Sequence, residues 1–229
     1  MADTNETTPW QPPGDVRERA TALLASDPLN ESDTVRDYFG DSFSRVRDFA
    51  HLLAVEGETR GLLGPREYDR LWERHILNSA AVVPFLPPGT VADVGSGAGL
   101  PGVVIAAMSP ARAVILIEPM ERRVAWLQDV SAALALDNIE VVRGRAEDLQ
   151  LQVACVTARA VASVDKLVKW CRPLVGPGGE MVFLKGRSVN DELASARHLL
   201  RKVRWEAEVH QATTIPGLEP TTVLRLHSS

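Results

Sequence analysis

From Pro87 to the C-terminus, short runs rich in β-branched residues alternate with segments of helical periodicity. This alternation predicts an α/β fold, because strands connected through a helix pair in parallel within one sheet. The expected strands are 91–94, 113–117, 139–142, 154–157 and 180–184, and the expected helices are 101–108, 120–136, 163–175 and 189–203.

Two further expected strands, 205–214 and 222–226, are separated only by a short stretch that contains Pro216, Gly217 and Pro220. So short a link suits an antiparallel hairpin better than a crossover helix. The sequence therefore predicts a seven-stranded, mostly parallel, Rossmann-like sheet with a terminal antiparallel hairpin.

The length of 229 residues suits one domain that carries an appendage. Residues 1–14 are polar and contain proline, so we expect a flexible tail. Residues 15–86 show apolar residues at spacings of three and four, which predicts an N-terminal helical extension whose third helix covers about 66–79. Residues 87–229 form the expected ligand-binding core.

Composition and charge exclude several classes of protein. Cys155 and Cys171 lack the spacing of a zinc site or a disulfide framework, so we expect no metal and a reducing, cytoplasmic environment. No signal peptide or membrane-length apolar run is present, so we expect no membrane partner. The net charge of −5 argues against a uniformly basic body, although residues 151–229 hold 11 basic and 7 acidic residues. We expect a monomer.

A glycine-rich stretch, DVGSGAGLPG at 93–102, follows the first expected strand. Read from Gly97 it is the dinucleotide fingerprint, and read from Asp93 it is the first motif of class I S-adenosylmethionine-dependent methyltransferases. Both ligands contain adenosine, and Glu118 at the end of the next strand could hold the ribose of either one. The terminal hairpin and the lack of a second, substrate-binding domain favour the methyltransferase.

Arg159 and Lys185 follow two of the expected strands, and ligands of open α/β sheets bind beyond the carboxyl ends of strands. A guanidinium pairs with phosphate through two hydrogen bonds, and lysine acts as a point charge. These positions favour an anionic substrate such as a nucleic acid.

The target atom is indicated by motifs that the chain lacks. There is no N/D-P-P-Y/F/W run of the kind that accompanies methylation of exocyclic amines, and no Pro-Cys dipeptide of the kind that attacks pyrimidine carbon. A target that needs neither a base nor a covalent nucleophile is favoured. The N7 atom of guanine is such a target, because its lone pair is free at neutral pH and positioning alone can then supply catalysis.

These residues together resemble the ribosomal small-subunit methyltransferase G family, also called glucose-inhibited division protein B. The matching stretches are RHILNS at 74–79, DVGSGAGLPG at 93–102, 145–147, 159–160 and 184–186. Residues 62–67 look like an actinobacterial variant of the segment that reads N-L-T in other members of the family. The resemblance implies N7 methylation of a guanine in the decoding-region loop of 16S rRNA, with S-adenosylmethionine as cofactor and 16S rRNA or the small ribosomal subunit as partner. Asn78 departs from the aspartate that is common in the family.

The expected site residues combine the strand ends with the resemblance, which itself implies cofactor contacts at Gly95, Leu100, Ala146, Glu147 and Arg159. We expect the cofactor to contact Asp93, Gly95, Gly97, Gly99, Leu100, Glu118, Ala146, Glu147 and Arg159. We expect Arg74, His75 and Lys185 on the substrate side. A lone histidine on an apolar helical face also suits a core position, but beside Arg74 we expect His75 to line the site, and we assign no general base.

Two alternatives stay open from the residues themselves. The first is a class I methyltransferase of a small metabolite, which would favour an apolar lid over Arg159 and Lys185. The second is a non-enzymatic module that binds an adenosine-containing ligand, for which the glycine turn would suffice.

Overall fold

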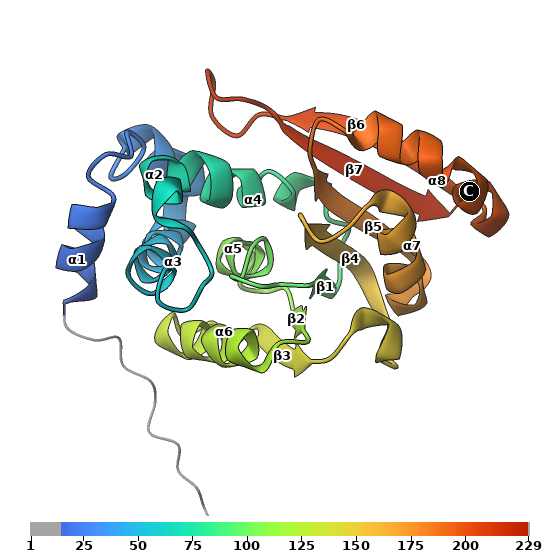
Figure 1. The fold of residues 1–229 in the computed structure, drawn as a ribbon, viewed down its shortest axis with the longest axis horizontal. Helices are drawn as coiled ribbons and strands as arrows, with labels where there is room; N and C mark the ends of the chain where they lie inside the picture. Colours follow the sequence, from blue (N-terminus) through green and yellow to red (C-terminus); the bar gives the residue numbers. More distant parts are fainter. Residues whose placement is uncertain (1–14, 229) are drawn as a thin grey trace, which may run out of the picture.

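A seven-stranded sheet forms the centre of the computed structural model, which describes residues 15–228 without the side chain of Pro65 (Figure 1). The predicted flexible tail, residues 1–14, lies outside the described residues. The strand order is β3-β2-β1-β4-β5-β7-β6. The strands are β1 (Val91–Val94), β2 (Val114–Glu118), β3 (Ile139–Arg143), β4 (Val153–Arg159), β5 (Val175–Lys185), β6 (Trp205–Ala212) and β7 (Thr221–Ser228).

Strands β1 to β5 pair in parallel, and β7 pairs antiparallel with both β5 and β6. The predicted parallel sheet with a terminal antiparallel hairpin is therefore confirmed. The carboxyl ends of the parallel strands lie at one edge of such a sheet, so the predicted strand-end residues face a common region.

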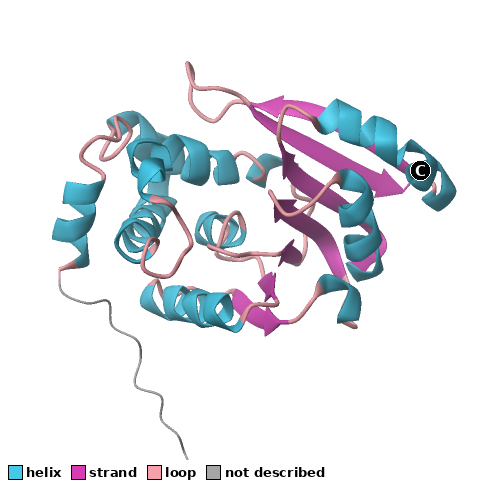
Figure 2. Cartoon of the chain, viewed as in Figure 1, coloured by secondary structure: helices cyan, strands magenta, loops and turns pink. Residues whose placement is uncertain are grey.

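Helices cover both faces of the sheet (Figure 2). On one face lie α5 (Gly102–Met108) and α6 (Glu121–Ala133), and on the other lie α7 (Val164–Cys171) and α8 (Val189–Val203). Successive residues of a strand point to opposite faces, so Leu116 belongs to the hydrophobic cluster of the first face and Ile117 to that of the second. Burial on both faces explains why the strands read as continuous apolar runs.

The N-terminal helices share the core of the first face. They are α1 (Val16–Leu23), α2 (Asp33–Phe39), a short 3-10 turn η1 (Gly40–Ser42) and α3 (Phe43–Glu56). Phe49 of α3 and Leu53 are fully buried in the same cluster as Val103 of α5 and Trp126 of α6. The change of pattern at residue 87 thus marks a change of secondary structure, while the hydrophobic core continues across it.

The expected helix over 66–79 is wrong in form. The chain instead makes a 3-10 helix, η2 (Pro65–Arg70), then a π-helix, η3 (Trp72–Leu77), and then a short turn, α4 (Asn78–Ala80). The buried carboxylate of Asp27 accepts a hydrogen bond from the backbone N–H of Trp72 at 2.9 Å, and Asn30 accepts one from the indole N–H. The side chain of Asp27, from a distant segment, therefore accepts the hydrogen bond of the first amide of η3, close to the point where the 3-10 helix ends and the π-helix begins.

Shorter 3-10 turns complete the chain: η4 (Val83–Phe85), η5 (Ala146–Asp148) and η6 (Arg172–Leu174). None of the helices in residues 15–228 is long and apolar enough to cross a membrane.

Gly102 sets how closely α5 approaches the sheet, because a Cβ there would lie 2.2 Å from Leu116 Cδ2 and 2.7 Å from Asp93 Oδ2. We expect Gly102→Ala to lower the free energy of unfolding by about 1–3 kcal/mol, the usual cost of overpacking a core. Urea denaturation measures the change. Gly64→Ala is the matched control, because a Cβ there meets no atom within 4 Å and the backbone has φ −86°. Equal midpoints for the two variants would contradict the close approach.

Candidate active site

The glycine turn leaves β1 and bends back over the sheet. Gly95, Gly97 and Gly99 have φ values of 69°, 54° and 97°, a region in which side chains cause strain. The backbone N–H groups of Gly95 and Ser96 donate to the carbonyl of Ile117, and the Ser96 hydroxyl donates to the carbonyl of Asp93. These bonds fix the turn against β2.

Asp93 supports the turn from behind. Its side chain is fully buried, Oδ2 accepts from the Gly102 N–H at 2.9 Å, and Oδ1 has no hydrogen-bond partner. Burial raises the pKa of Asp93 to about 7, against the smaller lowering effects of the Gly102 N–H and of the nearby Ser96 hydroxyl. Gly99 also faces inward, since a Cβ there would lie 2.7 Å from Val103 and 3.2 Å from Phe49. Neither residue lines the cavities described below, so their predicted contact with the cofactor stays a prediction.

Two adjoining cavities lie at the carboxyl edge of the sheet. The turn cavity has a volume of about 530 Å³ and is lined by Gly95, Gly97, Leu100, Glu118 and Arg159, among others. The second, the Trp170 cavity, has a volume of about 290 Å³ and is lined by Ile117, Ala146, Glu147 and Trp170, among others. Both share Gly95, Pro119 and Val161 as lining residues.

Glu118 connects the turn to the wall of the turn cavity. Its side chain is 2% exposed, Oε2 accepts from the Gly97 N–H at 2.9 Å, and Oε1 accepts from the Met120 N–H at 3.0 Å. A carboxylate oxygen accepts more than one hydrogen bond, so these contacts leave acceptor capacity toward the cavity.

A third and larger cavity, the Arg74 cavity, has a volume of about 820 Å³. Its lining includes the predicted substrate-side residues Arg74, His75 and Lys185, together with Asn78, Arg159 and Glu192. Arg159 lines both the turn cavity and the Arg74 cavity. Ala160 and Val161 line both cavities as well, so the structure brings the predicted cofactor side and the predicted substrate side together at the end of β4.

Lys185 is more enclosed than its predicted role suggests. Its side chain is 8% exposed, and its ammonium donates to the Ala162 carbonyl at 2.9 Å and pairs with Glu192 at 2.7 Å. An RNA phosphate could reach this ammonium only if the ion pair opened.

The Arg159 guanidinium is held from the N-terminal segment. Nη1 donates to the carbonyl of Arg74 at 3.1 Å and to Asn78 Oδ1 at 3.4 Å, and Nη2 lies 3.1 Å from His75 Nδ1. His75 Nε2 in turn lies 2.8 Å from Glu67 Oε2. Burial lowers the pKa of Arg159 to about 10, so the group stays cationic at neutral pH.

Some residues of the site were missed from the sequence. Val161 directly follows Arg159-Ala160 at the end of β4, so the strand-end rule could have found it. Glu67 ends the 62–67 stretch but was given no role, and Trp170 carries no motif. Only the folded chain brings these two residues to His75 and Ala146.

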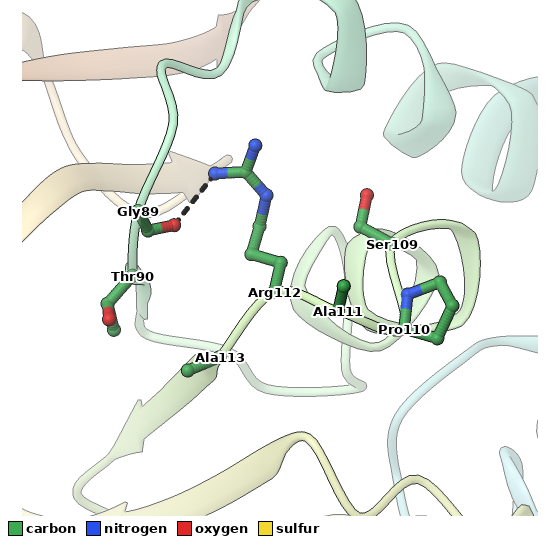
Figure 3. Close-up of a pocket in the computed structure, with 7 residues that line it drawn as sticks. All are labelled: Gly89, Thr90, Ser109, Pro110, Ala111, Arg112 and Ala113. Carbon is green, nitrogen blue, oxygen red and sulfur yellow. Dashed lines mark hydrogen bonds between the residues drawn. The ribbon is translucent and has the colours of Figure 1, made fainter.

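A separate cavity of about 520 Å³ lies at the opposite edge, between the residues that precede β1 and β2 (Figure 3). Its one charged side chain, Arg112, donates to the carbonyls of Pro87 and Gly89. None of the predicted site residues lines it, so we do not place the active site there. Within residues 15–228, no group of three or more His, Cys, Asp or Glu side chains could hold a metal ion.

Comparison with known sequences gives one family. The model of the family described as rRNA small subunit methyltransferase G matches residues 42–216. A protein named ribosomal RNA small subunit methyltransferase G from Bifidobacterium longum (strain DJO10A) is 43% identical over 215 residues, covering 87% of this chain and 97% of that protein. Its namesake from Leifsonia xyli subsp. xyli is 50% identical over 168 residues, covering 72% of this chain and 80% of that protein.

Solved structures share the fold at low sequence identity. The ribosomal protein L11 methylase of Lactobacillus delbrueckii subsp. bulgaricus gives a TM-score of 0.52 at 14% identity, covering 67% of this chain and 77% of that one. M. jannaschii TYW2 in complex with AdoMet gives a TM-score of 0.52 at 16% identity, covering 66% and 74%.

The raised pKa of Asp93 makes stability depend on pH. Between its ordinary pKa of 3.8 and about 7, the folded protein keeps a proton that the unfolded chain has lost, so this group lowers stability as pH rises through that range. Asp93→Asn resembles the protonated acid and cannot ionise. We expect the unfolding free energy of the variant minus that of the wild type to rise by on the order of 3 kcal/mol from pH 5 to pH 8. Urea denaturation at each pH measures this difference. A difference that does not change with pH would contradict this.

Proposed function

Because the chain belongs to the rRNA small subunit methyltransferase G family, we propose that it transfers a methyl group from S-adenosylmethionine to N7 of a guanine in the decoding-region loop of 16S rRNA. The main support is the position of Arg159, which with its neighbours Ala160 and Val161 lines both the turn cavity and the Arg74 cavity and is the one charged residue of the three. A cofactor in the first cavity and a base in the second would meet at this side chain.

The described residues fit the cofactor. A Cβ at Gly97 would have no neighbouring atom nearer than 3.6 Å, so the space in front of this backbone is open to a ligand. The Glu118 carboxylate would accept from the ribose hydroxyls, and the backbone of Ala146 and Glu147 would meet the edge of the adenine. Ile117, Val161 and Trp170 supply the apolar wall that a flat ring requires.

When bound, S-adenosylmethionine supplies a methyl group on a positively charged sulfur. Guanine N7 offers its own lone pair, so no proton has to leave the attacking atom. The lining of the Arg74 cavity agrees with this, because Glu192, the one carboxylate among its described lining residues, is already paired with Lys185. The lining residues of the Arg74 cavity would exclude water and hold the base in line with the methyl group. The rate enhancement would arise from this positioning.

Arg74 is the best placed residue for an RNA phosphate. Its side chain is 53% exposed at the mouth of the Arg74 cavity, and its contact with Glu67 is a long 3.6 Å. A guanidinium in this setting can exchange a weak surface pair for a phosphate, with which it forms two hydrogen bonds. Lys185 would then stabilise the cavity wall through Glu192 in the unbound protein.

The setting of the reaction follows from the substrate. The protein would act as a monomer in the cytoplasm, on 16S rRNA or on the small ribosomal subunit. Both cysteines are buried as free thiols, which agrees with a reducing environment.

The site of methylation is tested with small-subunit rRNA from cells that lack the enzyme. Incubation with the protein and tritiated S-adenosylmethionine should label the rRNA, and borohydride with aniline should then break the strand at one guanine. Gly97→Val is the control and should lose both signals, because its side chain enters the turn cavity at a strained φ of 54°. Labelled rRNA that stays intact under aniline would show that the methyl group is on an atom other than N7.

A further inference from the structure

We propose that Glu67 and His75 act as a relay that positions the Arg159 guanidinium between the turn cavity and the Arg74 cavity. The inference deepens the proposed function and rests on it, because the two cavities are assigned there to cofactor and base. Neither Glu67 nor His75 need touch the reacting atoms for this role.

The hydrogen-bond partners assign the protons of His75. A guanidinium can only donate, so His75 Nδ1, 3.1 Å from Arg159 Nη2, accepts through its lone pair. The neutral ring then carries its proton on Nε2, which donates to the Glu67 carboxylate at 2.8 Å. Glu67 thus selects the tautomer whose other nitrogen can hold Arg159.

The remaining contacts of Arg159 come from the same segment. The carbonyl of Arg74 and the side chain of Asn78 accept from Nη1, so residues 74–78 supply acceptors to both terminal nitrogens. Asn78 also donates from Nδ2 to Thr221 Oγ1 at 3.0 Å, which ties this segment to β7. The guanidinium is thereby held from η3 and from the first residue of α4, while the backbone of Arg159 belongs to β4.

The relay requires His75 to be neutral. Burial and the nearby charge of Arg159 lower the pKa of His75 below its ordinary value of 6.5, with a smaller contribution from Arg74, and the Glu67 carboxylate opposes them. Protonation of Nδ1 would turn an acceptor into a donor that faces the donors of Arg159. The contact would then be lost, so positioning fails as the pH falls through the lowered pKa.

A role as general base does not fit these contacts. Nδ1 already accepts a hydrogen bond from Arg159. Nε2 is already protonated and donates its hydrogen bond to Glu67, so neither nitrogen is free to receive a proton from a substrate. His75 is therefore a positioning residue.

The two amide substitutions at residue 75 separate its nitrogens. In His75→Asn the side-chain oxygen takes the place of Nδ1 and can still accept from Arg159. In His75→Gln the amide nitrogen takes the place of Nε2 and can still donate to Glu67, while the acceptor for Arg159 is lost. We expect kcat for rRNA methylation near pH 7.5 to stay within about threefold of wild type in His75→Asn and to fall at least about tenfold in His75→Gln.

The pH profile adds a readout that a merely structural role would not move. Below the ordinary histidine pKa of 6.5, kcat of the wild type should fall as His75 protonates, whereas His75→Asn should show no such fall over the same pH range. Equal losses of kcat in His75→Asn and His75→Gln would indicate that His75 acts as a general base or only in packing. Wild-type kcat in both variants would show that the hydrogen bond between His75 and Arg159 does not contribute to the reaction. Either result overturns the relay.

Glu67→Gln tests the relay if His75→Gln does not fold. The amide oxygen can still accept from Nε2–H, but the negative charge that raises the pKa of His75 is gone. We expect the acidic fall in kcat to move to lower pH. Glu73→Gln is the matched control, because Glu73 lies on the same segment but pairs with the exposed Arg70. An unchanged profile in Glu67→Gln, or the same shift in Glu73→Gln, would contradict the relay.

The tautomer itself can be read without any methyl transfer. Nitrogen-15 spectra of histidine-labelled protein near pH 7.5 should show a neutral ring with its proton on Nε2, and the signal should be absent from His75→Asn. If the wild type methylates no rRNA, the proposed function fails while this spectrum still tests the relay. A proton found on Nδ1 overturns the relay even if rRNA is methylated.

Discussion

Helix α5 can lie against β1 and β2 only because residue 102 has no side chain. Its first amide then meets the buried Asp93 carboxylate, and this contact fixes the end of the glycine turn on the sheet. The N-terminal helices pack against the same turn, since a Cβ at Gly99 would lie 3.2 Å from Phe49 Cζ. The turn that lines the turn cavity is therefore held in place by one close contact between a helix and the sheet.

The sequence predicts the regular elements well where burial on both faces makes apolar runs continuous. The bounds of β1 and α8 agree with the prediction, and the ends of the other strands of the core differ by a few residues. Segment 66–79 shows what local periodicity misses. Its apolar spacing indicates one helix, but the carboxylate of Asp27 takes the Trp72 amide and divides the segment into 3-10 and π geometries. A contact between distant parts of the chain has no local signature.

The candidate site is only partly readable from the sequence, for a similar reason. Strand ends and the glycine turn predict which residues reach the carboxyl edge, and Arg159 is found in this way. The sequence does not tell that Lys185 is paired with Glu192 or that Asp93 is sealed behind the turn. It gives Glu67 no role because an acid on a short helix acquires one only when folding places it against His75.

We propose that the glycine turn and the segment after β3 hold the cofactor in the turn cavity and the Trp170 cavity, with Arg159 between the cofactor and the substrate. A crystal structure of the protein with S-adenosylhomocysteine is the sharpest test. We expect the adenine in the Trp170 cavity, the ribose hydroxyls on Glu118, and the sulfur in the turn cavity on the side that faces Arg159. A ligand bound at another edge of the sheet, or a sulfur turned away from the Arg74 cavity, would contradict it.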